Sequence, residues 1–312
     1  MRMLCRVLLA ISASAYAGAV ANGRALAPLG QSAGAGQSNQ KPSLQGQQGQ
    51  QGQPAQPSPA AVGTVSTPEE RQAYQDLVSE ATAGLDPDRV ISLAQDYEKK
   101  YPNSSMLSFV YMFEASAYEG KNDFAKLVDA AEKSLKLNAD NLASLMMLAS
   151  VLPLPQVTRG TDLEKQKKLD EAEADAKHAL ELIDQDKVPR QPNETDDAYK
   201  KRKNAIASEP HASLGMVHLQ RATMGLGGLD PEELNKAAQE FKQSVEMTDR
   251  PQPEHYYRLG EVYKHQKKVD DAIAAFSKAS ELAQGTPLQQ FADTQIEELK
   301  KSQTQAKPAG TH

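Results

Sequence analysis

One recurring pattern constrains the fold of this chain more than any other: a helical stripe of apolar residues, then a short turn and a second stripe. It is clearest in residues 253–286, where the spacings i, i+3, i+4, i+7 and then i, i+4, i+7 predict two facing helices. Glycine inside a helix costs about 1 kcal/mol, so Gly260 predicts a close approach of the second helix at Ala272. The predicted repeat-packing residues are Tyr256, Leu259, Gly260 and Tyr263 on the first helix and Ala272, Phe276 and Ala279 on the second.

The same spacing fits four further stretches of the chain, two of which carry insertions. Thr67, Pro68 and Glu70 predict the start of the ordered part, as the cap and first turn of a helix. One helix pair cannot bury its own apolar face, so such pairs are stable only when they stack. The predicted repeats are 71–104, 108–141, 142–184 with an insertion, 208–250 with an insertion, and 253–286, followed by an end cap at 287–302.

This pattern resembles the tetratricopeptide repeat, most strongly in residues 253–286. The resemblance implies an all-α solenoid, a right-handed superhelix of about five helix hairpins with a C-terminal capping helix. It also implies a concave wall, lined by the first helix of each pair, that binds a protein or peptide partner. Two residues depart from the pattern: Glu114 stands in a leucine position, and Gln284 replaces the usual closing proline.

The third and fourth repeats depart further, because extra segments lie within and between them. Residues from Asp162 onward predict an extended second helix in the third repeat, and Thr195 predicts the cap of an additional helix at 196–207. Pro210 is expected to break or kink the chain before the fourth repeat. The end cap is expected to place four apolar residues near one face: Leu288, Phe291, Ile296 and Leu299.

The first 66 residues read as processing and linker segments. Residues 1–21 have the layout of a secretory signal peptide, and 22–66 have the Gln, Gly, Pro and Ser composition of a disordered linker. Cleavage would leave a chain without its one cysteine, Cys5, and with no transmembrane span. We therefore expect an exported protein, periplasmic or extracellular. An uncleaved segment would instead hold the chain near a membrane. Residues 303–312 are expected to form a disordered tail.

No catalytic, metal-binding or cofactor-binding pattern emerges, and we predict a chain that is not an enzyme. His211 and His218 occupy packing positions and lack the i, i+4 spacing typical of a metal pair. The net charge of −6 argues against nucleic acid as a partner. Two alternatives stay open. One is a self-associating envelope component, and the other is an enzyme that uses the inserted loops with Arg159, Asp162, Arg221 and Asp230.

The residues of the predicted concave wall favour a partner held by apolar contact. The set is rich in methionine, which adapts to varied partners, and it lacks the lysine and asparagine clamp for a peptide carboxylate that the family uses. The predicted function is therefore an exported scaffold in cell-envelope assembly or a periplasmic complex. The alternative is that the insertions or the helix at 196–207 cover this wall. The predicted partner-binding groove consists of Phe109, Met112, Phe113, Met146, Met147, Met216, Tyr257 and Arg258.

Overall fold

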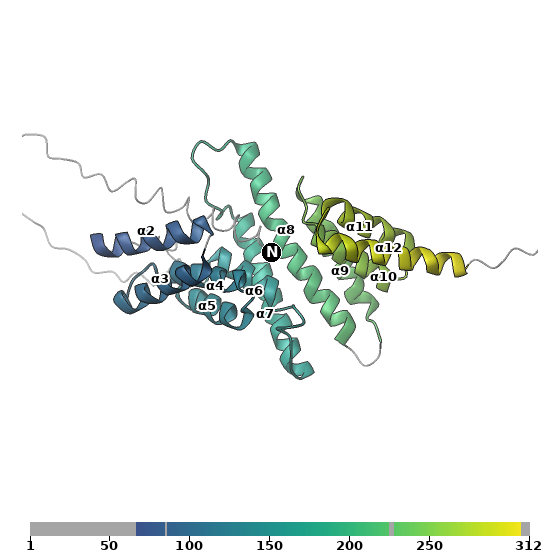
Figure 1. The fold of residues 1–312 in the computed structure, drawn as a ribbon, viewed down its shortest axis with the longest axis horizontal. Helices are drawn as coiled ribbons and strands as arrows, with labels where there is room; N and C mark the ends of the chain where they lie inside the picture. The colour runs from purple at the N-terminus through teal and green to yellow at the C-terminus, as the bar shows by residue number, and fades with distance from the viewer. Residues whose placement is uncertain (1–66, 85, 225–227, 307–312) are drawn as a thin grey trace, which may run out of the picture.

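A computed structural model describes residues 67–84, 86–224 and 228–306 of the chain (Figure 1). These residues form eleven α-helices and no strand. The predicted signal peptide, the predicted linker and the end of the tail lie outside the described residues. The helices are α2 (Pro68–Ala83), α3 (Pro87–Lys100), α4 (Leu107–Gly120), α5 (Phe124–Leu137), α6 (Leu142–Val151), α7 (Asp162–Asp184), α8 (Asp196–Met224), α9 (Pro231–Glu246), α10 (Pro253–His265), α11 (Val269–Leu282) and α12 (Pro287–Ala306).

Local sequence signals set the beginnings of these helices. Thr67 caps α2 by accepting the Glu70 N–H, and Asp230 caps α9 in the same way. Thr161 and Glu164 form a reciprocal capping box at the start of α7, where the extended helix is predicted. Five helices begin with proline, whose missing N–H would have no helical partner at that position.

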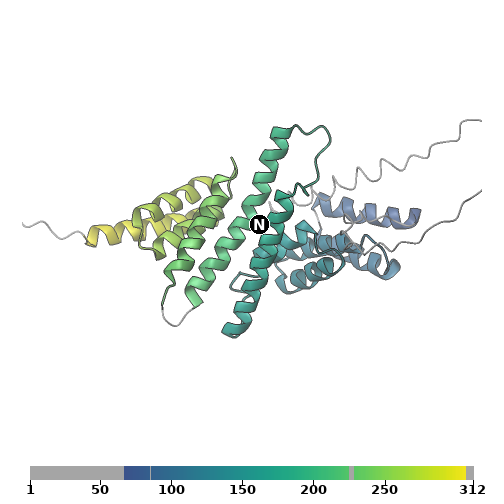
Figure 2. The same ribbon diagram turned by 180° about the vertical axis from the view of Figure 1, so that it is seen from behind.

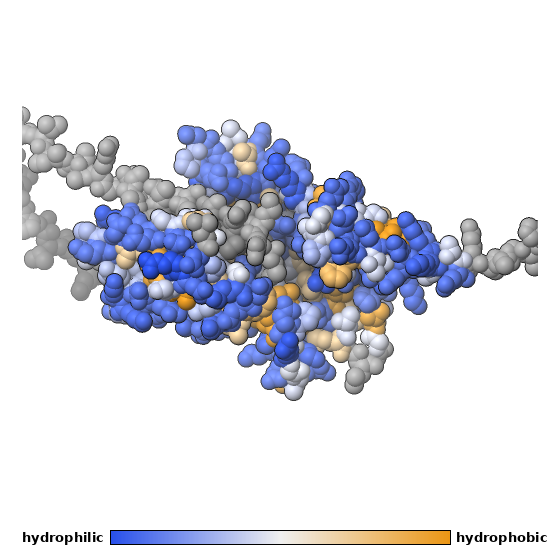
Figure 3. Space-filling model, viewed as in Figure 1, coloured by the Kyte–Doolittle hydropathy of each residue, from blue (hydrophilic) through white to orange (hydrophobic). Residues whose placement is uncertain are grey.

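The helices stack as antiparallel hairpins in chain order, α2–α3, α4–α5, α6–α7, α8–α9 and α10–α11, with α12 against the last pair. Figures 1 and 2 show α7 and α8 crossing the middle of the elongated molecule, with α2–α5 on one side and α9–α12 on the other. The face drawn in Figure 3 is hydrophilic over both ends, and hydrophobic residues gather near α7 and α8. The predicted solenoid of helix hairpins is confirmed.

The predicted packing residues of 253–286 form the seam between α10 and α11. Leu259 and Gly260 are buried, the second-helix residues are fully buried, and Tyr256 and Tyr263 are half-buried. One detail of the prediction is wrong. A Cβ on Gly260 would lie 2.8 Å from the ring of Phe276, so the close neighbour is this ring and not Ala272. Gly260 leaves room for an aromatic side chain.

The expected break at Pro210 is wrong, because α8 runs through it as one helix of 29 residues. An internal proline costs about 3 kcal/mol. Both flanks of Pro210 are anchored by buried residues, Ile206 and Ala207 before it and Leu214 and Val217 after it. Tertiary packing on both sides outweighs the local cost.

The capping helix α12 differs in its buried face and its length from the prediction. Leu299 and Ala292 are buried and Ile296 is half-buried, but Phe291 is 61% exposed. The face follows an i, i+4, i+7 spacing from Ala292, which places Phe291 just outside it. The helix also continues to Ala306, four residues beyond the predicted cap. No helix among the described residues has the length and apolar content that a membrane span needs.

Candidate partner-binding pocket

The middle of the predicted groove is filled rather than open. Met112, Phe113, Met146 and Met147 are only 3%, 1%, 3% and 2% exposed. They belong to one apolar cluster with residues of the segment that precedes the fourth repeat, namely Val188, Tyr199, Ile206 and Ala207. The prediction that these four side chains line an open wall is wrong, because all four are buried. The helix α6, which carries Met146 and Met147, packs against α8, and Phe113 packs against Tyr74 of α2. The alternative of a covered wall describes this region.

The other four predicted groove residues are half-buried and lie on three helices, α4, α8 and α10. Phe109 packs against the same cluster, and Met216 packs against the cluster of the C-terminal hairpins. Tyr257 meets Phe276 edge-on, with 5.2 Å between ring centroids, and burial raises the pKa of its hydroxyl. Arg258 donates to Glu261 at 2.7 Å. Tyr257 and Arg258 are therefore engaged within the last hairpin.

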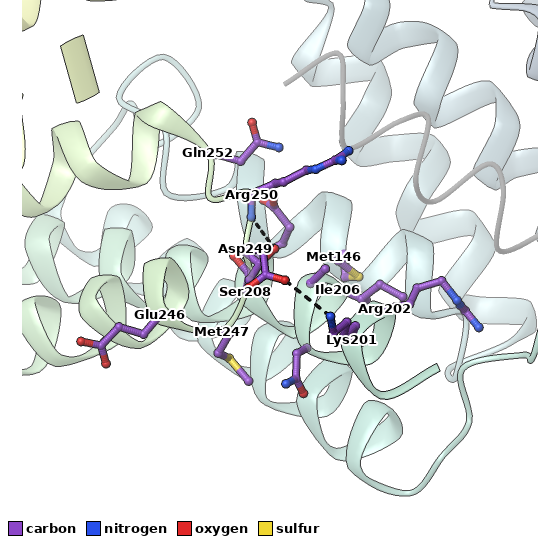
Figure 4. Close-up of a pocket in the computed structure, with 14 residues that line it drawn as sticks. Met146, Lys201, Arg202, Ile206, Ser208, Glu246, Met247, Asp249, Arg250 and Gln252 are labelled. Carbon is purple, nitrogen blue, oxygen red and sulfur yellow. Dashed lines mark hydrogen bonds and ion pairs between the residues drawn. The ribbon is translucent and has the colours of Figure 1, made fainter. Parts of the chain in front are cut away.

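A pocket of about 620 Å³ opens beside the covered methionines (Figure 4). One wall is the first half of α8, the other is the end of α9 with the connection to α10, and α6 contributes Met146. This volume lies in the range of small-ligand and peptide side-chain pockets. The lining residues are Met146, Lys201, Arg202, Asn204, Ala205, Ile206, Ser208, Glu209, Glu246, Met247, Thr248, Asp249, Arg250 and Gln252.

The pocket has an apolar floor and a charged rim. Met146 and Ile206 form the buried part of the lining, and Met247 is half-buried. Lys201, 79% exposed, lies across the mouth from Asp249, with 3.9 Å between Nζ and Oδ2. An exposed ion pair at this distance contributes about 0.2–1 kcal/mol. It is weak enough to be exchanged for contacts with a partner.

The α8 wall is held rigidly by the loop before it. Arg202 donates to both carboxylate oxygens of Glu194, at 2.8 and 2.7 Å, and to the carbonyl of Pro189 at 2.7 Å. These hydrogen bonds lower the pKa of Glu194 to about 2. The Tyr199 hydroxyl donates to the carbonyl of Val188 at 3.0 Å, and the Arg190 guanidinium lies over its ring. Bidentate arginine pairs of this kind fix geometry as well as add energy.

Polar side chains behind the pocket tie α8 to α9 and α10. Ser208 Oγ donates to the Ser244 carbonyl at 2.9 Å, and Ser244 Oγ lies 2.7 Å from His255 Nδ1. The other ring nitrogen of His255 is 3.5 Å from Glu209. A buried network with every member paired rigidifies the elements that it joins. The two pocket walls therefore hold a fixed separation.

Two histidine–carboxylate pairs along the α8–α9 seam escaped the sequence analysis. His211 Nδ1 lies 2.7 Å from Glu240 and His218 Nδ1 lies 2.8 Å from Glu233. The sequence does carry the signal: both pairs of positions are seven residues apart, and antiparallel helices match the first histidine with the second glutamate. Packing positions for the histidines were predicted, and their carboxylate partners were missed.

The described residues contain no group of three or more His, Cys, Asp or Glu arranged to hold a metal ion. Two of the four residues named for the enzyme alternative have structural roles. Arg221 pairs with Glu173 and Asp170 of α7, and Asp230 caps α9.

Comparison with known proteins agrees with this architecture. Residues 254–286 match the family model of the tetratricopeptide repeat. The predicted resemblance is confirmed on the stretch where the pattern is strongest, and the chain has a tetratricopeptide-like helix-hairpin fold. Such repeats are scaffolds for protein–protein interaction.

Several solved structures share the arrangement at low identity. The assembly chaperone of RpL4 (Acl4, residues 1–338) is 10% identical, over 75% of this chain and 86% of that one, with a TM-score of 0.52. TTC0263, a thermophilic TPR protein of Thermus thermophilus, is 17% identical over 73% and 99%, with a TM-score of 0.49. Yeast Tom70 is 14% identical over 77% and 41%, with a TM-score of 0.47. No curated protein matches the chain. These likenesses concern the fold alone.

Proposed function

We propose that this chain is an exported scaffold that holds a segment of a partner protein in the pocket between α8 and the α9–α10 connection. The observation that carries the proposal is an apolar floor framed by two rigid walls on a helix-repeat fold. The signal-peptide layout of residues 1–21 supports export, and a role in cell-envelope assembly or a periplasmic complex follows from it.

Apolar contact supplies most of the binding energy in this proposal. Burying one leucine-sized or phenylalanine-sized side chain contributes about 1.5–3 kcal/mol, against about 0.2–1 kcal/mol for an exposed ion pair. A side chain on the floor formed by Met146 and Ile206 therefore anchors the partner. Of the methionines predicted on the wall, only Met146 lines the pocket, and Met247, which was not predicted, lies beside it.

Site-specific photo-crosslinking in the source cell tests the pocket. A benzophenone side chain at Gln252, on the pocket rim, should give a discrete adduct with another protein. The matched control is the same group at Gln290, which is exposed on α12 and is not part of the pocket lining. Equal adducts at both positions, or none at Gln252, would contradict the pocket proposal. An adduct with a second copy of this chain would support self-association instead.

A filled pocket provides an independent check. Ala205→Trp places an indole in the cavity and should remove the Gln252 adduct, while Ala274→Trp on the exposed face of α11 should leave it unchanged. Cell fractionation with N-terminal sequencing tests export: the mature chain should begin near residue 22 in the exported fraction. A full-length chain in the cytoplasmic fraction would contradict export.

A further inference from the structure

The wall of the pocket carries the strongest basic run of an acidic protein. Residues 200–203 read Lys-Lys-Arg-Lys, the one place in the sequence where four basic residues stand together, although the net charge is −6. The run lies in the first half of α8, and Lys201 and Arg202 line the pocket. Positive charge is therefore concentrated where the proposed partner segment enters.

Part of this charge is neutralised within the chain. Arg202 is bound to Glu194 and Lys203 pairs with Asp186. Lys200 makes no ion pair among the described residues, and Lys201 has only the distant Asp249 at 3.9 Å. Lys201 therefore keeps charge available at the α8 side of the mouth.

The opposite wall adds a further cation, Arg250. Its backbone N–H donates to Thr248 Oγ1 at 3.2 Å, and its guanidinium makes no ion pair within the described part of the chain. In Figure 4, Met146 and Ile206 lie between Arg250 of the α9–α10 connection and Lys201 of α8. The apolar floor is thus flanked by a positive group on each side.

The lining also carries three acidic groups, and each of them already lies near a basic side chain. Glu209 faces His255 at 3.5 Å, and Glu246 lies 3.8 Å from Lys242 on its own helix. Asp249 is 89% exposed and reaches only Lys201. A carboxylate entering the mouth would replace Asp249 at Lys201 and meet Arg250 without displacing any partner.

Resting on the proposed function, we propose that the partner segment is an acidic peptide. One apolar side chain of this peptide fills the floor at Met146 and Ile206, and carboxylates on either side pair with Lys201 and Arg250. Apolar burial supplies the affinity, and the two cations select acidic over basic or neutral flanks.

Fluorescence anisotropy with the full chain tests this preference. The probes are three short fluorescein-labelled peptides that share their leucines and differ only in the flanking residues: glutamate, glutamine or lysine. The glutamate peptide should bind about tenfold more tightly than the glutamine peptide at low salt. This advantage should shrink as the salt concentration rises, because the paired charges are solvent-exposed.

Reversing the charges of Lys201 and Arg250 tests whether these two residues cause the preference for the glutamate peptide. Lys201→Glu combined with Arg250→Glu should remove or invert the advantage of the glutamate peptide. The matched control is Lys300→Glu with Lys301→Glu on α12, where Lys301 is similarly exposed and lies 3.9 Å from its own carboxylate partner, Glu297. That control should leave the advantage unchanged.

The outcomes separate this inference from the proposed function. Equal affinity for the glutamate and glutamine peptides, preference for the lysine peptide, or an advantage that survives the pocket reversal would overturn the acidic-peptide inference. So would a failure of all three peptides to bind. In each of these cases the Gln252 crosslink decides separately whether the pocket holds a partner protein.

Discussion

The hairpins in the two halves of the molecule solve the same packing problem with different residue pairs. At two equivalent positions of the seam, the second and third hairpins have two alanines, whereas the fourth and fifth have a glycine and a phenylalanine. A Cβ on either glycine would lie 2.8 Å from the facing ring. A phenylalanine at the second position therefore stands opposite a glycine at the first, whereas two small residues meet in the other hairpins. The pairs are Ala115 with Ala131, Ala149 with Ala176, Gly215 with Phe241, and Gly260 with Phe276.

Removing the ring of the glycine–phenylalanine seam should have the largest effect on stability. Phe276 is fully buried, so Phe276→Ala should reduce the free energy of unfolding by about 3–5 kcal/mol through lost apolar contact and the cavity left behind. Ala131→Gly, at the equivalent position of the second hairpin, should cost about 1 kcal/mol. Urea unfolding followed by circular dichroism measures both. Similar losses for the two variants would contradict the difference between the halves.

Adding one methyl group at the glycine tests the same seam from the other side. Gly260→Ala should destabilise by about 1–3 kcal/mol through overpacking against Phe276, although alanine favours the helix by about 1 kcal/mol. Gly260→Ala combined with Phe276→Leu should cost less than the sum of the single changes, because the shorter side chain vacates the contested space. Stabilisation by Gly260→Ala alone would show that the ring moves aside freely.

The halves also differ in their partly buried carboxylates. In the fourth hairpin, Glu233 and Glu240 each face a histidine. On α7, Asp175 lies near Glu171, Glu132 and His178, and its Oδ2 has no hydrogen-bond partner within the described residues. Burial, and then the charge of Glu171, raise the pKa of Asp175 from 3.8 to about 7. Folding therefore favours the neutral carboxyl group. The resulting stability is fully present below about pH 4 and is lost as the pH rises through about 7, where the buried group ionises.

Asp175→Asn should therefore stabilise the protein at pH 8, by about 1–2 kcal/mol after solvent screening, and have little effect at pH 4. Thermal unfolding at the two pH values measures the difference. Glu173, two residues away, is the control of opposite sign. Burial would raise its pKa, but hydrogen bonds from Lys177 and Arg221 outweigh this and lower the pKa to about 2. Glu173→Gln should destabilise at both pH values. A pH-independent effect of Asp175→Asn would contradict the raised pKa.

The hairpin architecture could be predicted from the sequence because helical spacing and capping depend on residues that are close together in the chain. Thr67 caps α2 where its side chain predicts a helix start, and α7 begins at Asp162 as predicted. The course of α8 through Pro210 was not predictable locally, because it depends on burial on both flanks. The open wall was wrong for the same reason: Met146 occupies a position that an isolated repeat exposes, and α8, which packs against α6, comes from later in the chain. The pocket exists only where that segment meets the α9–α10 connection.

The smallest expected effect concerns a phenylalanine of the C-terminal half that lies outside the seams. Phe291 was expected on the buried face of the cap, yet it is 61% exposed while the adjacent Ala292 is fully buried. Phe291→Ser should therefore change the free energy of unfolding by less than about 0.5 kcal/mol. Ala292→Ser, the matched substitution one position along, should cost about 1 kcal/mol or more, because it buries a hydroxyl against the seam of α11. Urea unfolding measures the free energy of unfolding of both variants. A larger loss for Phe291→Ser than for Ala292→Ser would support the buried face predicted from the sequence, which includes Phe291.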